Sequence, residues 1–212
     1  MKDIVIIGSG GFGAEVAMLI EDINKEKLTW NLKGFVDDNP NMLGKRIYNY
    51  KVIGDIDWLK SQEMYTVIAI GDGKVRENIY QRIKSTKNKF ATLIHPNVLY
   101  SDAVKIGEGS IICAGNIITT NISIGKQVII NLSSTIGHDA VLDDYVTILP
   151  GVHVSGHVQL EKYVTIGTGT QIIQGLTVGK GTIVGAGATV VKELPENCTA
   201  VGSPAKPIKY HE

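Results

Sequence analysis

Every sixth residue from Ile106 to Val190 is a branched aliphatic residue. The fifteen positions are Ile106, Ile112, Ile118, Ile124, Ile130, Ile136, Leu142, Ile148, Val154, Leu160, Ile166, Ile172, Val178, Val184 and Val190. Four residues after most of them comes a small or β-branched residue: Ser110, Val128, Ser134, Ala140, Val146, Val152, Val158, Val164, Thr170, Thr182 and Ala188. A period of six is neither helical nor that of a hairpin sheet. It is typical of a parallel β-helix built from hexapeptide repeats, which we expect over residues 106–195.

The hexad also predicts where each residue points. The aliphatic residue faces inward, the small residue fills a corner of the narrow core, and the third and fourth residues turn outward. Three hexads make one triangular coil, so residues eighteen apart stack at a rise of about 4.8 Å per coil. Fifteen hexads therefore give roughly five coils. Coils of this kind usually turn left-handed, an exception to the ordinary crossover rule.

The N-terminus predicts a different fold. Residues 3–8 form a short apolar run, rich in β-branched residues, that predicts a buried parallel strand. The segment 8–13 then fits the pattern GxGxxG and leads directly into a predicted helix. In this context glycines let backbone N–H groups approach a diphosphate at the helix N-terminus. The alternative is a tight strand–helix turn that binds no ligand.

A parallel α/β domain is expected to continue to residue 96. Strands are predicted at 29–36, 51–54, 65–70 and 90–95, and helices at 56–61 and 74–85, the latter with Val75, Ile79 and Ile83 as its apolar residues. Asp37 and Asp38 end the second strand, where a carboxylate meets ribose hydroxyls or simply begins a turn. Gly71 and Asp72 form a second strand–glycine–helix junction. Because residues 1–96 are too few for two mononucleotide halves, we expect a Rossmann-like domain that binds a nucleotide-sugar rather than NAD.

Residues 97–212 are expected to form the β-helix domain with a C-terminal tail. The segment 194–197 breaks the hexad phase, and 201–207 is predicted to be an extended arm that closes the last coil.

Composition excludes several classes of function. The net charge is +0, so no basic surplus indicates nucleic acid or a membrane surface. Two cysteines far apart in the sequence suit a reducing compartment. No apolar run approaches a membrane span, and the N-terminus lacks the pattern of a signal peptide. We expect a cytoplasmic protein.

Histidines at the corners of the coils are the candidates for chemistry. His138 and Asp139 are the third and fourth residues of one hexad, and eighteen residues on come Gly156 and His157. Gly156 should therefore stack on His138 and His157 near Asp139. Histidine beside a carboxylate is the general-base arrangement, and a solvated surface histidine is the alternative.

The remaining histidines are expected to have other roles. His153 is predicted to face outward from a flat side, and His95, before a proline, to be structural. A zinc site would have to use His138, His153 and His157, which lie on different columns, so no metal is expected.

The chain resembles the NeuD-like sugar acyltransferases, which include N-acetyltransferases for nucleotide-linked 4-amino sugars of the bacillosamine and perosamine kind. The similar segments are GSGGFGAEV (8–16), GFVDDN (34–39), IAIGDG (68–73), TLIHPNV (92–98), NLSSTIGHDAVL (131–142), GTGTQIIQGLTVGKGTIVGAGATVVK (167–192) and VGSPAK (201–206). The resemblance implies a homotrimer with acetyl-CoA in the groove between coils and a nucleotide-sugar on the N-terminal domain. It implies no metal.

The same resemblance implies roles for individual residues. His138 matches the catalytic base and Asp139 the acidic residue after it. The oxyanion and acetyl-CoA would be bound by Gly156, His157, Gly167 and Gly185. The nucleotide-sugar would be bound by Gly8, Gly10, Gly11, Phe12, Gly13, Asp37, Asp38, Gly71 and Asp72. Phe12 and Thr147 depart from the family, since both replace histidines of other members.

These features predict direct transfer of an acetyl group from acetyl-CoA to a sugar amine, with His138 as general base. The alternatives are O-acetylation of a sugar hydroxyl, acetylation of a small amino-acid acceptor, a zinc lyase or hydratase, and a non-catalytic oligomeric nucleotide-binding module.

Overall fold

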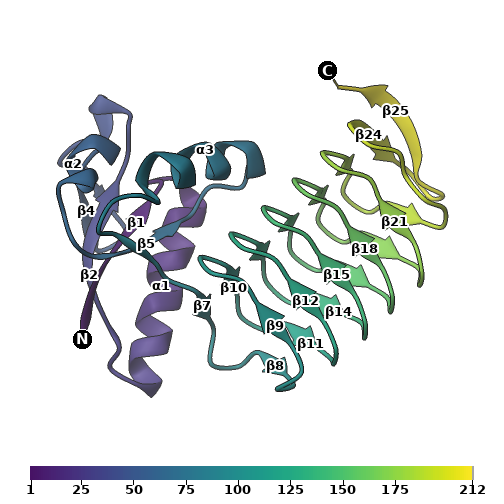
Figure 1. The fold of residues 1–212 in the computed structure, drawn as a ribbon, viewed down its shortest axis with the longest axis horizontal. Helices are drawn as coiled ribbons and strands as arrows, with labels where there is room; N and C mark the ends of the chain where they lie inside the picture. The colour runs from purple at the N-terminus through teal and green to yellow at the C-terminus, as the bar shows by residue number, and fades with distance from the viewer. Residues whose placement is uncertain (212) are drawn as a thin grey trace. The chain divides into compact units, whose positions relative to one another are not determined.

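The protein is described by a computed structural model that covers residues 1–211. The chain divides into two compact units, Met1–Pro96 and Asn97–Glu212. Figure 1 colours the first unit from purple to teal and the second from teal to yellow.

A mostly parallel sheet forms the first unit. Its elements are β1 (Lys2–Ile7), α1 (Gly11–Glu26), β2 (Trp30–Val36), η1 (Pro40–Met42), β3 (Arg46–Ile47), β4 (Tyr50–Gly54), α2 (Ile56–Lys60), β5 (Tyr65–Ile68), α3 (Gly73–Ile83), β6 (Lys89–Phe90) and β7 (Leu93–Ile94). The strand order is β3-β4-β2-β1-β5-β6, in which β3 is antiparallel to β4 and the other neighbours pair in parallel. The glycine turn after β1 and the junctions after β2 and β5 therefore share one edge of the sheet.

Helices cover both faces of this sheet. Val5 and Ile7 of β1 belong to a buried cluster with residues of α2 and α3. The alternate residues Ile4 and Ile6 are fully buried on the opposite face, where α1 packs against β1 and β2. Because β1 is buried on both faces, its sequence is a continuous apolar run and does not alternate between apolar and polar residues.

Two expectations for this unit are wrong. The predicted strand 90–95 is split into β6 and β7, because Phe90 ends the pairing with β5. Val75, expected on the apolar face of α3, is 44% exposed. Arg76 is fully buried instead, and its Nη1 donates to the carbonyls of Ile70 and Gly71, both at 2.8 Å. The guanidinium therefore satisfies backbone acceptors at the end of β5.

The second unit consists of stacked three-sided coils (Figure 1). After β8 (Leu99–Tyr100) its strands are β9 (Lys105–Ile106), β10 (Ile111–Ile112), β11 (Ile117–Ile118), β12 (Ser123–Ile124), β13 (Ile129–Ile130), β14 (Thr135–Ile136), β15 (Val141–Leu142), β16 (Thr147–Ile148), β17 (His153–Val154), β18 (Gln159–Leu160), β19 (Thr165–Ile166), β20 (Gln171–Ile172), β21 (Thr177–Val178), β22 (Ile183–Val184) and β23 (Thr189–Val190). Each strand from β9 to β23 ends on one of the fifteen predicted aliphatic residues. Every third strand pairs in parallel, so Thr135 lies beside His153 and Ile136 beside Val154.

The core of the coils is as predicted. All the predicted inward aliphatic residues except Ile106 are buried, and every residue of the second track is fully buried. Hydroxyls on this track bond the backbone of the next coil. Ser134 Oγ, for example, donates to the Leu149 carbonyl at 3.3 Å and accepts from Val152 N–H at 3.1 Å. The buried hydroxyls of serine and threonine therefore form hydrogen bonds with backbone groups at the corners, which aliphatic side chains cannot do.

The fourth residue of many hexads has a positive φ. The non-glycine examples include Asn121 (57°), Asp139 (59°) and His157 (58°), and the glycines include Gly175 (74°). These four residues are eighteen apart, so they form one column along a corner. Asparagine and aspartate tolerate this backbone conformation better than most residues.

The tail differs from the predicted arm. Strand β24 (Cys198–Val201) pairs in parallel with β22 and continues the stack. Strand β25 (Lys206–Tyr210) then turns back and pairs with β24 in antiparallel. The end of the stack is thus covered by a hairpin rather than by a single arm. No helix within residues 1–211 has the length and apolar character needed to span a bilayer.

The inward and outward positions predict unequal effects on stability. Ile118 is 1% exposed and its strand neighbour Ile117 is 44% exposed. Ile118→Ala should lower the free energy of unfolding by about 2–5 kcal/mol, because it removes buried methylenes and leaves a cavity. The matched change Ile117→Ala should cost about 0.5 kcal/mol. Urea denaturation at one protein concentration measures both, and equal losses would contradict the assignment of the two faces.

Candidate active site

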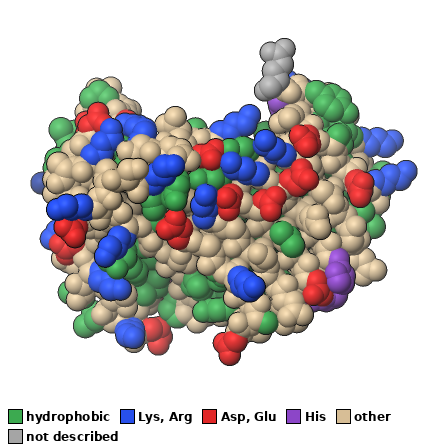
Figure 2. Space-filling model, viewed as in Figure 1, with side chains coloured by type: hydrophobic (Ala, Val, Ile, Leu, Met, Phe, Trp, Pro, Cys, Tyr) green, Lys and Arg blue, Asp and Glu red, His purple; other side chains and the backbone are tan. Residues whose placement is uncertain are grey.

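Three polar side chains meet at one corner of the coils. His138 and Asp139 occupy the turn between β14 and β15, and His157 occupies the equivalent turn one coil later. The backbone brings them together, since His157 N–H donates to the His138 carbonyl at 2.9 Å. All three are accessible, with 57%, 37% and 64% of the side chain exposed. Histidine side chains gather beside an acidic one on this surface (Figure 2).

The imidazole of His138 is held in one orientation. Its Nδ1 lies 2.7 Å from Asp139 Oδ2. A hydrogen bond from His138 and a second from the Asn121 side chain lower the pKa of Asp139, although partial desolvation opposes them. An ionised carboxylate can only accept, so Nδ1 must carry the hydrogen. Neutral His138 therefore keeps the lone pair on Nε2, where it can accept a proton.

The lowered pKa of Asp139 has a defined effect on stability. Its value in the folded protein lies below the unfolded value of about 3.9. The interaction therefore stabilises the fold above that pH, and the contribution is lost as the pH falls through the folded pKa. The hydrogen bond that orients His138 thus persists throughout the neutral range.

His157 contacts the pair without completing a hydrogen bond. Its Nε2 lies 3.7 Å from Asp139 Oδ2, and its ring meets that of His138 edge to face at 5.1 Å. The predicted position of His157 over Asp139 is therefore observed. Its ring would add positive charge beside the carboxylate when protonated.

Gly156 leaves the space that the imidazole occupies. A methyl group at this position would lie 2.7 Å from both Cε1 and Nε2 of His138. Contacts below 3.0 Å force something to move, and here that group is the candidate base. The expected stacking of Gly156 on His138 is thus present in the structure.

The other candidates in the coils lie elsewhere. Gly167 and Gly185 follow β19 and β22, on a different corner from His138. Side chains there would meet the backbone of Ala186 at 2.5 Å and the side chain of Val201 at 2.7 Å. Close coil packing therefore explains both glycines, and a contact with acetyl-CoA stays a prediction. Thr147 is buried on β16, away from the His138 corner.

One group of side chains at the same corner could bind a metal ion. Among residues 1–211, His138, Asp139 and His157 form the one group whose ligand atoms all lie within 4.8 Å of one another. His153 is not part of it, and its Nδ1 lies 2.8 Å from Thr135 Oγ1. His95 lies 15% exposed with its Nε2 3.3 Å from Asp22, as a structural residue would. The expectation of no metal stays a prediction.

The glycine turn combines structural glycines with open ones. Gly8 has a φ of 103°, and a side chain on Gly13 would collide with the Gly8 carbonyl. A methyl group added to Gly10 or Gly11 would meet no atom of residues 1–211 within 4 Å. These two residues therefore leave open space beside the start of α1, which is where a diphosphate would approach.

The acidic candidates are held by the chain itself. Asp37 Oδ2 accepts from Ser9 N–H at 3.0 Å and from Ser9 Oγ at 2.5 Å. Burial raises the pKa of Asp37, but these bonds and one from Asn39 N–H bring it below its usual value. Asp37 thus ties the end of β2 to the glycine turn and stays ionised.

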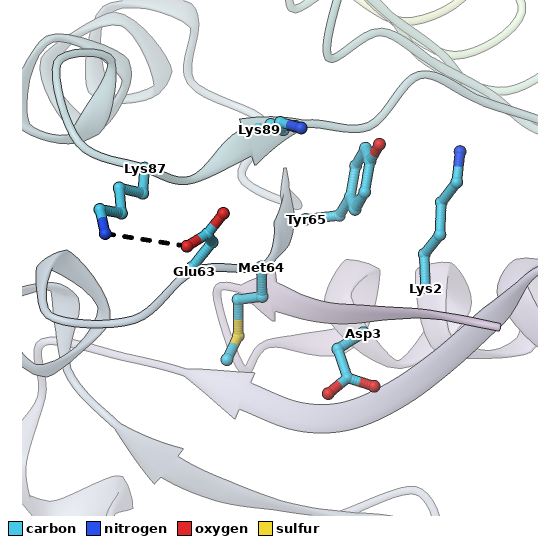
Figure 3. A pocket seen from close by; sticks show the side chains of 7 residues that line it. All are labelled: Lys2, Asp3, Glu63, Met64, Tyr65, Lys87 and Lys89. Carbon is cyan, nitrogen blue, oxygen red and sulfur yellow. Dashed lines mark ion pairs between the residues drawn. The ribbon is translucent and has the colours of Figure 1, made fainter.

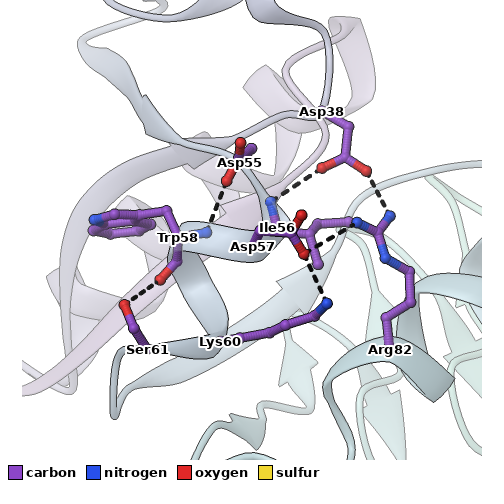
Figure 4. A network of polar contacts seen from close by, with 8 residues as sticks. All are labelled: Asp38, Asp55, Ile56, Asp57, Trp58, Lys60, Ser61 and Arg82. Atoms are coloured by element: carbon purple, nitrogen blue, oxygen red, sulfur yellow. Dashed lines mark hydrogen bonds and ion pairs between the residues drawn. The ribbon is translucent and has the colours of Figure 1, made fainter.

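Asp38 and Asp72 have structural partners. Asp38 accepts from Ile56 N–H at 3.0 Å and pairs with Arg82 at 2.5 Å (Figure 4). Asp72 caps α3 through the N–H groups of Lys74 and Val75.

The last two candidates of this domain lie at the same edge of the sheet. Phe12 is half-buried at the start of α1. A methyl group at Gly71 would meet no described atom within 4 Å. The nucleotide-sugar contacts assigned to the residues of this edge stay predictions.

Two cavities border the first unit's sheet at opposite ends of its strands. One, of about 280 Å³, lies at the carboxyl ends of β2 and β4 and includes Asp37 and Trp58 in its lining. The other, of about 220 Å³, lies where β1, β5 and β6 begin and is lined by Lys2, Tyr65 and Lys89 among others (Figure 3). Ligands of open α/β sheets bind at the carboxyl ends of the strands, and the first cavity lies at that edge, as the glycine turn does.

Known proteins share both halves of this arrangement. The family described as PglD N-terminal domain matches residues 3–83. GDP-perosamine N-acetyltransferase of Escherichia coli O157:H7 is 34% identical over 159 residues, which cover 74% of this chain and 71% of that protein. The chain belongs to the NeuD-like sugar acyltransferases.

Solved structures of family members cover the whole chain. PerB from Caulobacter crescentus, in complex with CoA and GDP-perosamine, is 30% identical and has a TM-score of 0.90, over 99% of this chain and 98% of that one. The acetyltransferase domain of PglB from Neisseria gonorrhoeae, in complex with acetyl coenzyme A, is 32% identical with a TM-score of 0.89, over 98% and 99%. The predicted fold, a Rossmann-like domain followed by a left-handed β-helix, is confirmed. Like its relatives, the chain is an acyltransferase.

Not every residue around the two sites could be recognised from the sequence. Asn121 lies eighteen residues before Asp139 and could have been found by extending the column by one coil. Arg76 carries no signal, because only its burial separates it from the other cationic residues of α3.

The contact between Gly156 and His138 generates a test. Gly156→Ala should displace the imidazole, changing the chemical shifts of His138 and Asp139 in NMR spectra and reducing acetyl transfer. Ser155→Ala, in the same turn, should change neither property. Unaltered His138 signals in the Gly156→Ala protein would contradict the geometry described.

Proposed function

We propose that the protein transfers the acetyl group of acetyl-CoA to the amino group of a nucleotide-linked sugar. His138 acts as the general base in this reaction. The observation that carries the proposal is the 2.7 Å hydrogen bond from His138 Nδ1 to Asp139, which leaves the lone pair on Nε2 of a side chain that is 57% exposed. Membership of a family whose solved structures contain CoA, acetyl-CoA and GDP-perosamine supports both substrates.

The acetyl group passes directly from the thioester to the amine, through a tetrahedral intermediate. The sugar amine attacks the carbonyl carbon of acetyl-CoA, forming the C–N bond while the amine proton passes to Nε2 of His138. The C–S bond then breaks, and the imidazolium returns its proton to the CoA thiolate. General-base assistance of this kind contributes about 10²–10⁴-fold. The adjacent carboxylate of Asp139 stabilises the imidazolium while it exists.

Two further groups serve this step in our proposal. The Gly156 N–H would donate to the developing oxyanion, a contribution of about 10²–10³-fold where such donors have been removed. His157 would contact acetyl-CoA beside the pair. No acyl-enzyme is required, because Cys113 and Cys198 are 5% and 0% exposed and lie away from this corner.

The two units have separate roles in this proposal. We assign the nucleotide-sugar to residues 1–96, where the open glycines Gly10 and Gly11 admit a diphosphate. Acetyl-CoA and the chemistry belong to residues 97–212. Buried thiols suit a reducing compartment, so we place the reaction in the cytoplasm.

The test combines a substrate screen with one variant. Acetyl-CoA is mixed with UDP-, GDP- or dTDP-linked 4-amino sugars, thiol release is followed, and the product is identified by mass spectrometry. His138→Ala should lower kcat about 10²–10⁴-fold, because the base is lost, and should leave acetyl-CoA binding nearly unchanged. His153→Ala, an exposed histidine on another column, should retain activity.

Several results would overturn the proposal. Full activity in His138→Ala would remove the base assignment. An ester product would indicate O-acetylation, and turnover of free amino acids without nucleotide-sugars would indicate a small acceptor. Loss of activity on treatment with a chelator would point to a metal enzyme. Failure to bind acetyl-CoA would leave a nucleotide-binding module.

We also propose that the protein is a homotrimer. Large apolar side chains are exposed on the later coils, among them Ile173 at 45% and Ile183 at 41%. Sedimentation equilibrium should give a mass of about 69 kDa, three times the 22.9 kDa of one chain. A mass of 22.9 kDa at micromolar concentration would contradict a trimer.

A further inference from the structure

The cavity at the carboxyl ends of β2 and β4 has the position of a base-binding pocket. In doubly wound sheets the acidic residue that ends the second strand meets the ribose, and the base lies beyond it. Here Asp37 ends β2, and the cavity of about 280 Å³ continues from Asp37 toward Asp55 and Trp58. The inference that follows rests on the proposed function, and it concerns which base the pocket accepts.

Apolar side chains form part of the lining of this cavity, among them Trp58 and Leu43. Trp58 packs directly on the end of β4, because Gly54 has no side chain: a methyl there would lie 2.6 Å from the indole ring. Leu43, after the short helix η1, is 64% exposed although it borders the cavity. An indole and an exposed leucine are suited to pack against a flat aromatic ring.

Three carboxylates also line the cavity, and they differ in what they can still accept. Asp37 already accepts from Ser9 and from Asn39 N–H. Asp38 uses one oxygen for Ile56 N–H and the other for Arg82. Within residues 1–211 the carboxylate of Asp55 accepts only from Trp58 N–H, at 2.7 Å through Oδ1, as the cap of α2 (Figure 4). Asp55 therefore has an oxygen available for a ligand.

We infer that this pocket selects guanine and that Asp55 is the residue that determines the selectivity. An ionised carboxylate accepts and cannot donate. Guanine presents two adjacent donors, N1–H and the exocyclic amino group, on one edge of its ring. Uracil and thymine present a single N–H between two carbonyl oxygens, which a carboxylate would repel. Among the described residues, no lysine or arginine lines the cavity to offset that repulsion. The substrate is thus a GDP-linked sugar.

Substitution by asparagine separates recognition from folding. Asparagine caps helices as well as aspartate does, so Asp55→Asn should leave α2 intact. Its amide donates as well as accepts, which complements xanthine, where a carbonyl oxygen replaces the amino group of guanine. The variant should therefore lose affinity for GDP and gain affinity for XDP. A merely structural role for Asp55 would not produce that exchange.

The experiment measures binding of GDP, XDP, UDP and dTDP to the full chain by isothermal titration calorimetry. The wild-type protein should bind GDP at least about 10-fold more tightly than UDP or dTDP. Asp55→Asn should weaken GDP about 10- to 100-fold, since a hydrogen bond to a charged group is lost, and should strengthen XDP. Asp57→Asn is the matched control, because Asp57 pairs with Lys60 at 2.7 Å on the same helix, contacts Arg82 only at 3.9 Å, and does not line the cavity.

The outcomes separate this inference from the proposed function. Wild-type preference for UDP or dTDP, or an equal loss of all four nucleotides in Asp55→Asn, would overturn guanine selectivity and leave the proposed acetyltransferase standing. Absence of binding by every nucleoside diphosphate would overturn both. If Asp55→Asn does not fold, the relative affinities of the wild-type protein for the four nucleotides are sufficient to test guanine selectivity.

Discussion

Hydrogen bonds between successive coils determine where every other group in the β-helix lies. From β8 to β20 each short strand pairs in parallel with the strand eighteen residues later, so these coils share one register. An aliphatic residue in every hexad holds that register by filling the core. The outward third and fourth residues of each hexad contribute little to this core and are therefore free to carry chemistry. The candidate base is one of them, placed by the backbone rather than by a fold of its own.

This regularity explains why the sequence is informative for one half of the protein. The sequence alone predicts that four residues lie together, because residues eighteen apart in the sequence are neighbours in successive coils. These residues are His138, Asp139, Gly156 and His157. The backbone hydrogen bond from His157 to His138 and the stacking of His138 on Gly156 follow from the same register. The first unit has no such rule. Its strands and glycine turn are predictable from local patterns, but Arg76 and Asp55 depend on contacts between segments that pack only in the folded sheet.

Structural and functional roles of the carboxylates also cannot be separated from the sequence. Asp37, Asp38 and Asp72 all follow strands on the same edge and are equal candidates for binding. In the structure Asp72 caps α3, Asp38 pairs with Arg82, and Asp37 ties β2 to Ser9. Among the three carboxylates that line the cavity, Asp55, which carries no motif, is the one that keeps an oxygen for a ligand. The number of donors around each oxygen distinguishes them, and that number is a property of the tertiary structure.

The single register has a consequence for how proteins of this kind can change length. Inserting one residue between Asp139 and Gly156 would move every later residue to the next position of the repeat, so that Ser155 would replace Gly156 above the imidazole. The same insertion would turn aliphatic residues outward along the rest of the stack. Adding or removing eighteen residues beyond His157 would leave both the core and the corner intact. The stack can therefore gain or lose residues only in whole coils, so the same catalytic corner can occur in stacks of different height.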